Sequence, residues 1–482
     1  MKRIRHWSAR HARTMESLYN GFCSVAPVFR PMIAMIGKKQ AEPLLARLEQ
    51  GIKGTLFDCR MCGECTLSAS GMACPMNCGK QLRNGPCGGV TASGGCEIFP
   101  EMHCVWIEAL DGSRLMANSA AGRQVQPPVD HSKRGSSTWL KIIVNEPDAA
   151  KKGAHERVPM KAHAVGSLER ACNSGRPVVT VEISPPDSVN PQDLLHRAEV
   201  FRGLVDAINV TDNAGANCHM SSLAASAILA SAGHAPVFQS ACRDRNRIAV
   251  QADIMGAAAL GVQNILCITG DGVGSGDHPQ ALPVFDLDSV SMLGIARGMR
   301  DHGTYASGRK LHSRPELFLG ATMNPFAPPY DDRIINLEKK IAAGAQFIQT
   351  QFCFDVKMFA SFMREVRLRG LDRQSHILAG VGPLPSARTA RWLKTHVPGV
   401  HIPDALIARM AYAEDQKREG VAICKEIIRA LKEIEGVAGY HLMGHKNEQL
   451  LAEIIVDTGL ADRSDANESS HYRDNMEDRL VA

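Results

Sequence analysis

A single carboxylate, Glu182, stands within the run Val178-Val-Thr-Val-Glu-Ile-Ser-Pro-Pro186. The run is short, rich in β-branched residues and ended by two prolines, which predicts a buried strand in apolar surroundings. Parallel strands of a barrel carry the active site at their carboxyl ends, so a charged residue there is a candidate for proton transfer. The alternative is a glutamate that is only exposed to solvent at the end of the strand. The run by itself fits both interpretations.

A second chemical feature is a group of eight cysteines in a segment crowded with glycine and proline. They are Cys59, Cys62, Cys65, Cys74, Cys78, Cys87, Cys96 and Cys104. Such a segment buries little apolar area, so we expect a metal to hold it together. The triplet with two-residue spacing, followed by a Cys-Pro pair, is similar to the ligand run that holds a [4Fe–4S] cluster in bacterial ferredoxins. The gap between Cys65 and Cys74 is longer than the corresponding gap in the ferredoxin run. Structural zinc bound by four thiolates is the alternative, and the spacing does not divide the eight cysteines into two sites.

Length and composition set the general class. A chain of 482 residues predicts two or three domains, and a net charge of +5 indicates no nucleic-acid partner. No apolar run reaches the roughly 18 residues that span a bilayer, and the N-terminus leads into no apolar signal region. We therefore expect a cytoplasmic protein, in which cysteines are thiols or metal ligands rather than disulfides.

The elements that would position these groups alternate between strands and helices after residue 177. The strand candidates are Val178–Ser184, Ala207–Thr211, Val237–Ala241, Asn264–Thr269, Leu317–Met323, Phe347–Phe354, Ile377–Val381 and Tyr440–Met443. Amphipathic helical patterns separate them, including one long pattern over Ile407–Ile434. About eight strand–helix copies predict a (β/α)8 TIM barrel of the α/β class, with an open doubly wound sheet as the alternative.

The same patterns predict four parts of the chain. Residues 1–108 form a small, basic, irregular cysteine-rich metal-binding domain, and the polar residues 109–163 form a linker in which Trp139–Val144 docks as a short strand or helix. Residues 164–460 form the barrel and end in an amphipathic helix over Glu448–Leu460. Residues 461–482 form a polar C-terminal tail.

Five motifs occur in order along the predicted barrel. They are Glu182 before Ser184-Pro-Pro186, Asn209-Val-Thr-Asp-Asn213, Thr269-Gly-Asp271, Lys340 before Ala343-Gly-Ala345, and Thr350-Gln-Phe-Cys-Phe-Asp355. Together they resemble the methylenetetrahydrofolate reductase family over about residues 165–450. The resemblance implies a flavin-dependent barrel that interconverts 5,10-methylene- and 5-methyltetrahydrofolate by hydride transfer. The cysteine-rich front resembles a small iron–sulfur or zinc partner of some bacterial reductases in this family, here fused to the barrel.

The resemblance also implies roles for individual residues. Glu182 matches the general acid, Asp271 a carboxylate beside flavin and pterin, and Gln351 an amide that recognises the pterin. Lys340 matches a cation near the flavin's phosphate tail, although a plain surface-helix lysine is its alternative. The remaining residues implied at the flavin or the substrate are Thr211, Gln239, Thr269, Gly270 and Asp286. For Asp355, a helix N-cap is at least as good an interpretation as a substrate contact.

Some positions depart from the NADH-using members of the family. Thr269 replaces an arginine, Gln239 a flavin-contacting histidine, Phe285-Asp286 a Tyr-Ala pair, and His445 a late arginine. The sequence therefore leaves open FAD against the smaller FMN, and NADH against a ferredoxin-like protein as the electron donor. Two other functions also fit: a pterin- or corrinoid-linked methyltransferase barrel, and a non-catalytic metal-bearing scaffold for electron transfer.

Overall fold

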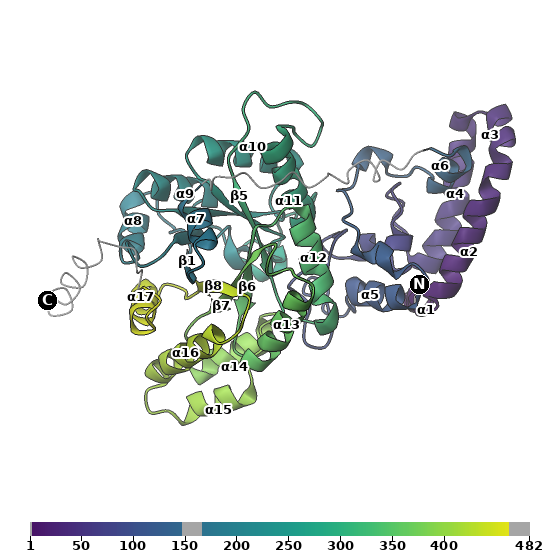
Figure 1. Ribbon diagram of the computed structural model, residues 1–482. Helices are drawn as coiled ribbons and strands as arrows, with labels where there is room; N and C mark the ends of the chain where they lie inside the picture. Colours follow the sequence, from purple (N-terminus) through teal and green to yellow (C-terminus); the bar gives the residue numbers. More distant parts are fainter. Residues whose placement is uncertain (1, 147–165, 462–482) are drawn as a thin grey trace.

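The computed structural model describes residues 2–146 and 166–461 (Figure 1). Eight parallel strands close into a barrel in sequence order, with β8 paired to β1. The strands are β1 (Val178–Ile183), β2 (Ala207–Val210), β3 (Pro236–Ala241), β4 (Asn264–Ile268), β5 (Phe318–Met323), β6 (Phe347–Phe352), β7 (His376–Val381) and β8 (Val437–Leu442). All eight predicted strands are confirmed. The alternative of an open doubly wound sheet is wrong, because β8 pairs with β1 along four residue pairs.

Helices surround the barrel on its outer side. They are α7 (Ser167–Asn173), α8 (Pro191–Glu199), α9 (Ser222–Ser231), α10 (Arg247–Ala259), α11 (Ser289–Arg297), α12 (Arg333–Ala343), α13 (Val356–Leu368), α14 (Ala387–His396), α15 (Asp404–Tyr412), α16 (Gln416–Lys432) and α17 (Glu448–Asp457). The single helix expected over Ile407–Ile434 is wrong. It is divided into α15 and α16 because Asp415 caps α16 by accepting from Arg418 N. Asp355 caps α13 in the same way, and α17 forms where the final amphipathic pattern predicts it.

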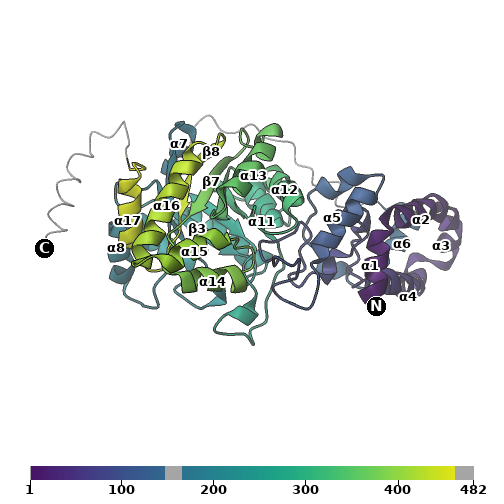
Figure 2. The ribbon, with the colours of Figure 1, turned by 90° about the horizontal axis from the view of Figure 1, so that it is seen from below.

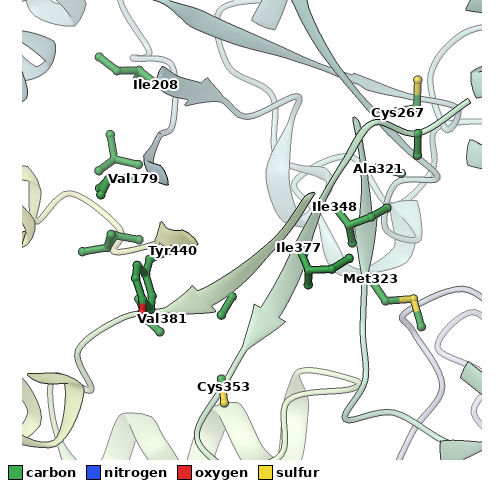
Figure 3. Close-up of a cluster of buried hydrophobic side chains, with 14 of the residues drawn as sticks. Val179, Ile208, Cys267, Ala321, Met323, Ile348, Cys353, Ile377, Val381 and Tyr440 are labelled. Carbon is green, nitrogen blue, oxygen red and sulfur yellow. The ribbon is translucent and has the colours of Figure 1, made fainter. Parts of the chain in front are cut away.

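The strands alternate between two apolar environments. On β1, Val179, Val181 and Ile183 face outward and join the large core between the sheet and the helices, part of which is shown in Figure 3. Val178 faces inward, toward a smaller cluster that closes the amino end of the barrel. Because side chains alternate along a strand, Glu182 belongs to the inner set. The valines that predicted apolar surroundings for this carboxylate point away from it.

The N-terminal part is helical at its outer edge and irregular toward the barrel (Figures 1 and 2). Its helices are α1 (Lys2–Arg10), α2 (Ala12–Val25), α3 (Arg30–Ile36), α4 (Lys38–Phe57), α5 (Val105–Leu115) and α6 (Thr138–Val144). The cysteine-rich residues 58–104 lie between α4 and α5 in the chain and contain short 3-10 turns and two isolated antiparallel β-bridges. No helix within the described residues is both long and apolar enough to cross a membrane.

The expected division of this part needs correction. The boundary at residue 108 falls inside α5, and residues 109–146 fold with the N-terminal segment rather than as a linker. The reason is a buried carboxylate, Glu49 of α4, which accepts from Ser137 Oγ at 2.7 Å and from Trp139 N at 3.2 Å. The docked stretch Trp139–Val144 is helical, as part of α6. The rest of the expected linker and nearly all of the expected tail lie outside the described residues.

A buried carboxylate of the barrel docks the cysteine-rich segment. Asp288, the N-cap of α11, accepts from the backbone N–H groups of Arg83 at 3.0 Å and Asn84 at 2.9 Å. The same side chain accepts from Ser291 N at 2.8 Å. These donors are buried, so removing the acceptor would leave them unsatisfied.

We expect Asp288→Ala to lower the free energy of unfolding by about 2–3 kcal/mol, because charged acceptors of buried N–H groups contribute in that range. Urea unfolding measures the change, and limited proteolysis should show faster cleavage within residues 58–104. The matched control is Asp277→Ala, whose side chain is exposed. Equal stability of the two variants would contradict the docking role of Asp288.

Candidate active site

A cavity of about 330 Å³ lies at the carboxyl end of the barrel. Its walls come from β1, β3, β4, β5, β6 and β8, and from residues 80–89 of the N-terminal segment. The volume is within the range of small-molecule and cofactor pockets. The cysteine-rich segment therefore forms part of the wall of the barrel's own cavity.

Seven of the nine barrel residues singled out in the sequence line this cavity. They are Glu182, Gln239, Thr269, Gly270, Asp271, Lys340 and Gln351. Thr211 is buried just beyond β2, and its hydroxyl has no hydrogen-bond partner in the described part of the chain. Asp286 does not line the cavity, because its carboxylate is held by Arg247, with Nη2 at 2.6 Å, and by His131, with Nε2 at 3.1 Å.

The carboxylate of Glu182 lies among polar groups. Gln239 Nε2 donates to Glu182 Oε2 at 3.3 Å, and His441 Nε2 lies 3.7 Å from the same oxygen. The Glu182 side chain is 27% exposed, so it reaches the cavity, whereas His441 is buried. A carboxylate with an amide donor on one side and an imidazole on the other can hold or release a proton at the cavity wall.

A polar network in the barrel interior orients His441, a residue that the sequence analysis did not single out. Thr180 Oγ1 lies 2.9 Å from His441 Nδ1, and Gln349 Nε2 donates to Thr180 Oγ1 at 3.1 Å. Gln349 in turn exchanges hydrogen bonds with Asn209, at 2.6 and 3.0 Å. The sequence contains one signal for this network: Gln349 and Gln351 are two residues apart on β6, so both side chains lie on its inner face.

The loop after β4 is held from both sides. Asp271 Oδ2 accepts from Gly215 N at 3.0 Å, and Lys80 Nζ of the N-terminal segment donates to the carbonyl of Gly270 at 2.5 Å. Gly270 has φ of +89°, which a side chain would strain. Burial alone would lower the pKa of Lys80, but the charges of Cys87, Glu97 and Asp271 raise it above its usual value. The ammonium thus stays charged at the cavity wall.

Three cations of α12 are buried where the N-terminal segment covers the barrel: Arg333, Lys339 and Lys340. Lys340 is 7% exposed, so the surface-helix interpretation is wrong. Its Nζ donates to the carbonyl of Thr322 at 2.5 Å. Burial and the neighbouring Arg333 lower the pKa of Lys340 to about 8. A cation in this position favours an anionic group in the cavity.

The eight cysteines of the front segment line two small, separate cavities. Cys59, Cys62, Cys65 and Cys74 line the first, beside α4, and Cys78, Cys87, Cys96 and Cys104 line the second, beside α5 and the barrel. No three Cys, His, Asp or Glu side chains in residues 2–146 and 166–461 form a group that could hold a metal ion. The metal site predicted at these cysteines, an iron–sulfur cluster with zinc as the alternative, is therefore not shown by this arrangement of side chains.

Comparisons with known proteins match both parts of the chain. The profile of the family described as methylenetetrahydrofolate reductase matches residues 167–459, and one described as methylene-tetrahydrofolate reductase C terminal matches residues 39–132. A probable methylenetetrahydrofolate reductase (NADPH) of Caenorhabditis elegans is 25% identical over 61% of this chain and 44% of its own length. Methylenetetrahydrofolate reductase 1 of Schizosaccharomyces pombe is 26% identical over 46% of this chain and 35% of its own.

The chain thus spans less than half the length of these two curated relatives. Among solved structures, an uncharacterized protein from Clostridium thermocellum, described as binding two copies of 5-methyl-5,6,7,8-tetrahydrofolic acid, aligns with 61% of this chain and 98% of that chain. The alignment has 16% sequence identity and a TM-score of 0.45.

The charge of Lys340 predicts a pH dependence. With FMN as a phosphate-ester probe, we expect affinity to fall as the pH rises through about 8, because the lysine loses its proton. The variant Lys340→Met should bind about tenfold more weakly at pH 7 and show no such fall. Fluorescence titration measures both, with the exposed Lys417→Met as control.

Lys340 should also make the stability of the unliganded protein depend on pH. The pKa of Lys340 is below its usual 10.5 in the folded state, so the unfolded chain binds more protons between about pH 8 and 10.5. Stability therefore rises with pH across that window, and Lys340→Met should remove this rise. A pH-independent FMN affinity in the wild type would contradict the role of the lysine.

Proposed function

The chain belongs to the methylenetetrahydrofolate reductase family, and we propose that it interconverts 5,10-methylene- and 5-methyltetrahydrofolate with a flavin bound in the barrel cavity. One observation carries the proposal. The residues that match the family's acid, carboxylate, amide and cation (Glu182, Asp271, Gln351 and Lys340) come from four different elements and line one cavity. Convergence of this kind is what a barrel active site requires.

The cavity offers what a flavin needs. Lys340 is a buried cation suited to the flavin's phosphate, and Gln239 and the backbone of Gly270 provide polar contacts at the strand ends. Thr211, with its unpartnered hydroxyl close to this region, is a further candidate contact. When bound, the flavin supplies the hydride that is exchanged with the one-carbon unit of the folate. Acid release and chromatography of the bound flavin identify it as FAD or FMN.

Glu182 is the proton donor in this proposal. Opening the methylene bridge of the substrate requires a proton on the departing nitrogen, and the side chain of Glu182 reaches the cavity from β1. The opened substrate is a cationic iminium, which the negative charge of Asp271 stabilises at the mouth of β4. The amide of Gln351 can donate and accept at once, as a pterin ring requires.

His441 positions the acid. Thr180 Oγ1 accepts from Gln349, so its own proton can be donated to His441 Nδ1. The other ring nitrogen of His441, Nε2, faces Glu182 Oε2 at 3.7 Å. The buried imidazole thus lies beside the carboxylate and limits where the Glu182 side chain can point.

We also propose that the cysteine-rich segment binds iron–sulfur and that the electron donor is a ferredoxin-like protein, with NADH as the alternative. The position of Cys87 supports this proposal, because this cysteine lines both a four-cysteine cavity and the barrel cavity. Reduction of the bound flavin by NADH alone, followed in an anaerobic spectrum, would show that NADH is the electron donor.

We further propose a cytoplasmic location, because the chain contains many free thiols.

The test of the reductase proposal is Glu182→Gln. The amide keeps the shape of the side chain but cannot deliver a proton, so we expect folate turnover to fall by at least about 100-fold. Turnover is assayed without oxygen from 5-methyltetrahydrofolate with an artificial electron acceptor, and flavin content is read from the absorbance spectrum. Flavin content should be unchanged.

The control is Glu414→Gln, an exposed carboxylate between α15 and α16 that should leave turnover unchanged. Wild-type protein that retains flavin but never converts either folate would refute the proposed reaction. Full activity in Glu182→Gln would refute the assigned acid while leaving the reaction in place.

A further inference from the structure

We propose that a helical tip at the far end of the N-terminal part binds reversibly to an anionic lipid bilayer, with its apolar side chains in the interface and nearby cations against the lipid phosphates. The tip is residues 25–36, which comprise the last residue of α2, the 3-10 turn η1 (Ala26–Phe29) and α3. The inference depends neither on the folate reaction nor on a metal in the cysteine-rich segment.

The tip exposes many apolar side chains. Met35 is 88% exposed and Val28 is 73% exposed. The large apolar residues of the tip that are exposed are Val25, Val28, Phe29, Met32, Met35 and Ile36. Single exposed apolar residues are normal on a soluble protein, but a group of them in one place marks a site of contact with a protein or a membrane.

Other apolar residues hold the tip in this shape. Ala26 and Ile33 are buried, and they form a small core with Ala41 of α4 and with Leu140 and Ile143 of α6. The backbone that carries the exposed side chains is therefore fixed against two other helices. The exposure is a feature of the folded N-terminal part and not of a loose end of the chain.

The exposed charges near the tip are positive. Residues 1–53 contain ten Lys and Arg but only three Glu. None of these glutamates is exposed, because Glu16 and Glu49 are buried and Glu42 is half-buried. The exposed cations in the described part of this stretch are Arg10, Arg13, Arg30, Lys38, Lys39 and Arg47. A surface of this kind attracts an anionic partner.

The distribution of the apolar residues around α3 favours a bilayer over a protein partner. Ile33 is the only residue of α3 that is buried, and residues 30–32 and 34–36 are all exposed. Because successive residues of a helix point about 100° apart, these residues cover most of its circumference. A protein surface would cover one face of so short a helix, whereas lipid surrounds a protruding element on every side.

The position of α3 allows it to reach a flat surface. In both views it lies at the end of the molecule opposite the barrel (Figures 1 and 2). The two family profiles match residues 39–132 and 167–459, so the tip belongs to neither. Helices α2 and α3 have 14 and 7 residues, fewer than the roughly 20 that span a bilayer. The tip therefore lies in the interface of the bilayer, and the barrel stays in solution.

A second copy of the chain is a less suitable occupant of the tip. A two-fold dimer would bring the same surface of two chains together, so Arg30, Lys38 and Lys39 would approach their equivalents. Like charges that meet at an interface oppose association. Anionic headgroups instead neutralise these cations, and each Lys or Arg near such a surface strengthens binding.

The first experiment is flotation of the full chain with lipid vesicles. With phosphatidylcholine containing about 30% phosphatidylglycerol, we expect binding at low salt that weakens as the salt rises. Binding to phosphatidylcholine alone should be at least about tenfold weaker. Equal binding to the two kinds of vesicle would overturn the role of the cations. No binding to either would overturn the proposal and leave an acidic protein surface as the occupant.

The second experiment removes apolar contacts of the tip. Val28→Gln combined with Met35→Gln should weaken binding to the anionic vesicles about 100-fold, because burying each of these side chains contributes about tenfold. The matched control is Leu260→Gln combined with Leu368→Gln, which removes two exposed apolar side chains at the ends of α10 and α13. Equal binding of the two double variants would contradict the proposed contact.

The third experiment removes cations beside the tip. Lys38→Gln combined with Lys39→Gln should weaken binding about tenfold and reduce its dependence on salt. Lys417→Gln combined with Arg418→Gln is the control, since these are also adjacent exposed cations, on α16 of the barrel. An equal loss in the control would show that net charge alone governs binding, and it would overturn the assignment to the tip.

Fluorescence quenching tests whether the tip enters the lipid. The tryptophan introduced by Phe29→Trp should be quenched by brominated phosphatidylcholine in anionic vesicles, whereas the one introduced by Leu368→Trp should not. A floating Phe29→Trp protein without added quenching would overturn the tip as the point of contact. Folate turnover with an artificial acceptor should be unchanged in all these variants, and its absence from the wild type would refute the reductase proposal alone.

Discussion

The closed register of the barrel is the constraint on which the rest of this structure depends. Because β8 pairs with β1, every strand has one inward and one outward face, and the outward residues pack beneath the helices. Inward residues near the carboxyl ends then face one another, the cavity and the N-terminal segment that covers it. That is how Glu182, Gln239 and His441, from strands far apart in the sequence, come within hydrogen-bonding or ionic distance.

The second constraint is the burial of charge where the N-terminal segment meets the barrel. Asp288 accepts backbone N–H groups of the segment, and Lys80 of the segment donates to Gly270 of the barrel. Asp288 and Lys80 are both buried, and each has hydrogen-bond partners in the other part of the molecule. The segment and the barrel therefore make one cavity, and the cysteines nearest to it lie at its wall.

Two buried cations of α12, Arg333 and Lys340, line the barrel cavity. Lys340 and Arg333 lie two turns apart on one helix, yet their polar contacts lead to different parts of the molecule. A protein that only needed stability would replace such cations with apolar side chains. Both cations line the barrel cavity, where an anionic group, once bound, would balance their charge.

The sequence by itself determined the barrel and most of its candidate site. Short β-branched runs bounded by polar turns are a local signal, and the motifs around Glu182 and Asp271 lie at strand ends in any parallel barrel. Only the tertiary structure decided which groups are paired. Asp286 is held by Arg247 and His131, Lys340 is buried by a segment some 250 residues away, and the cysteines separate into two groups. Those outcomes depend on contacts between distant parts of the chain, and spacing along a sequence carries no measure of such contacts.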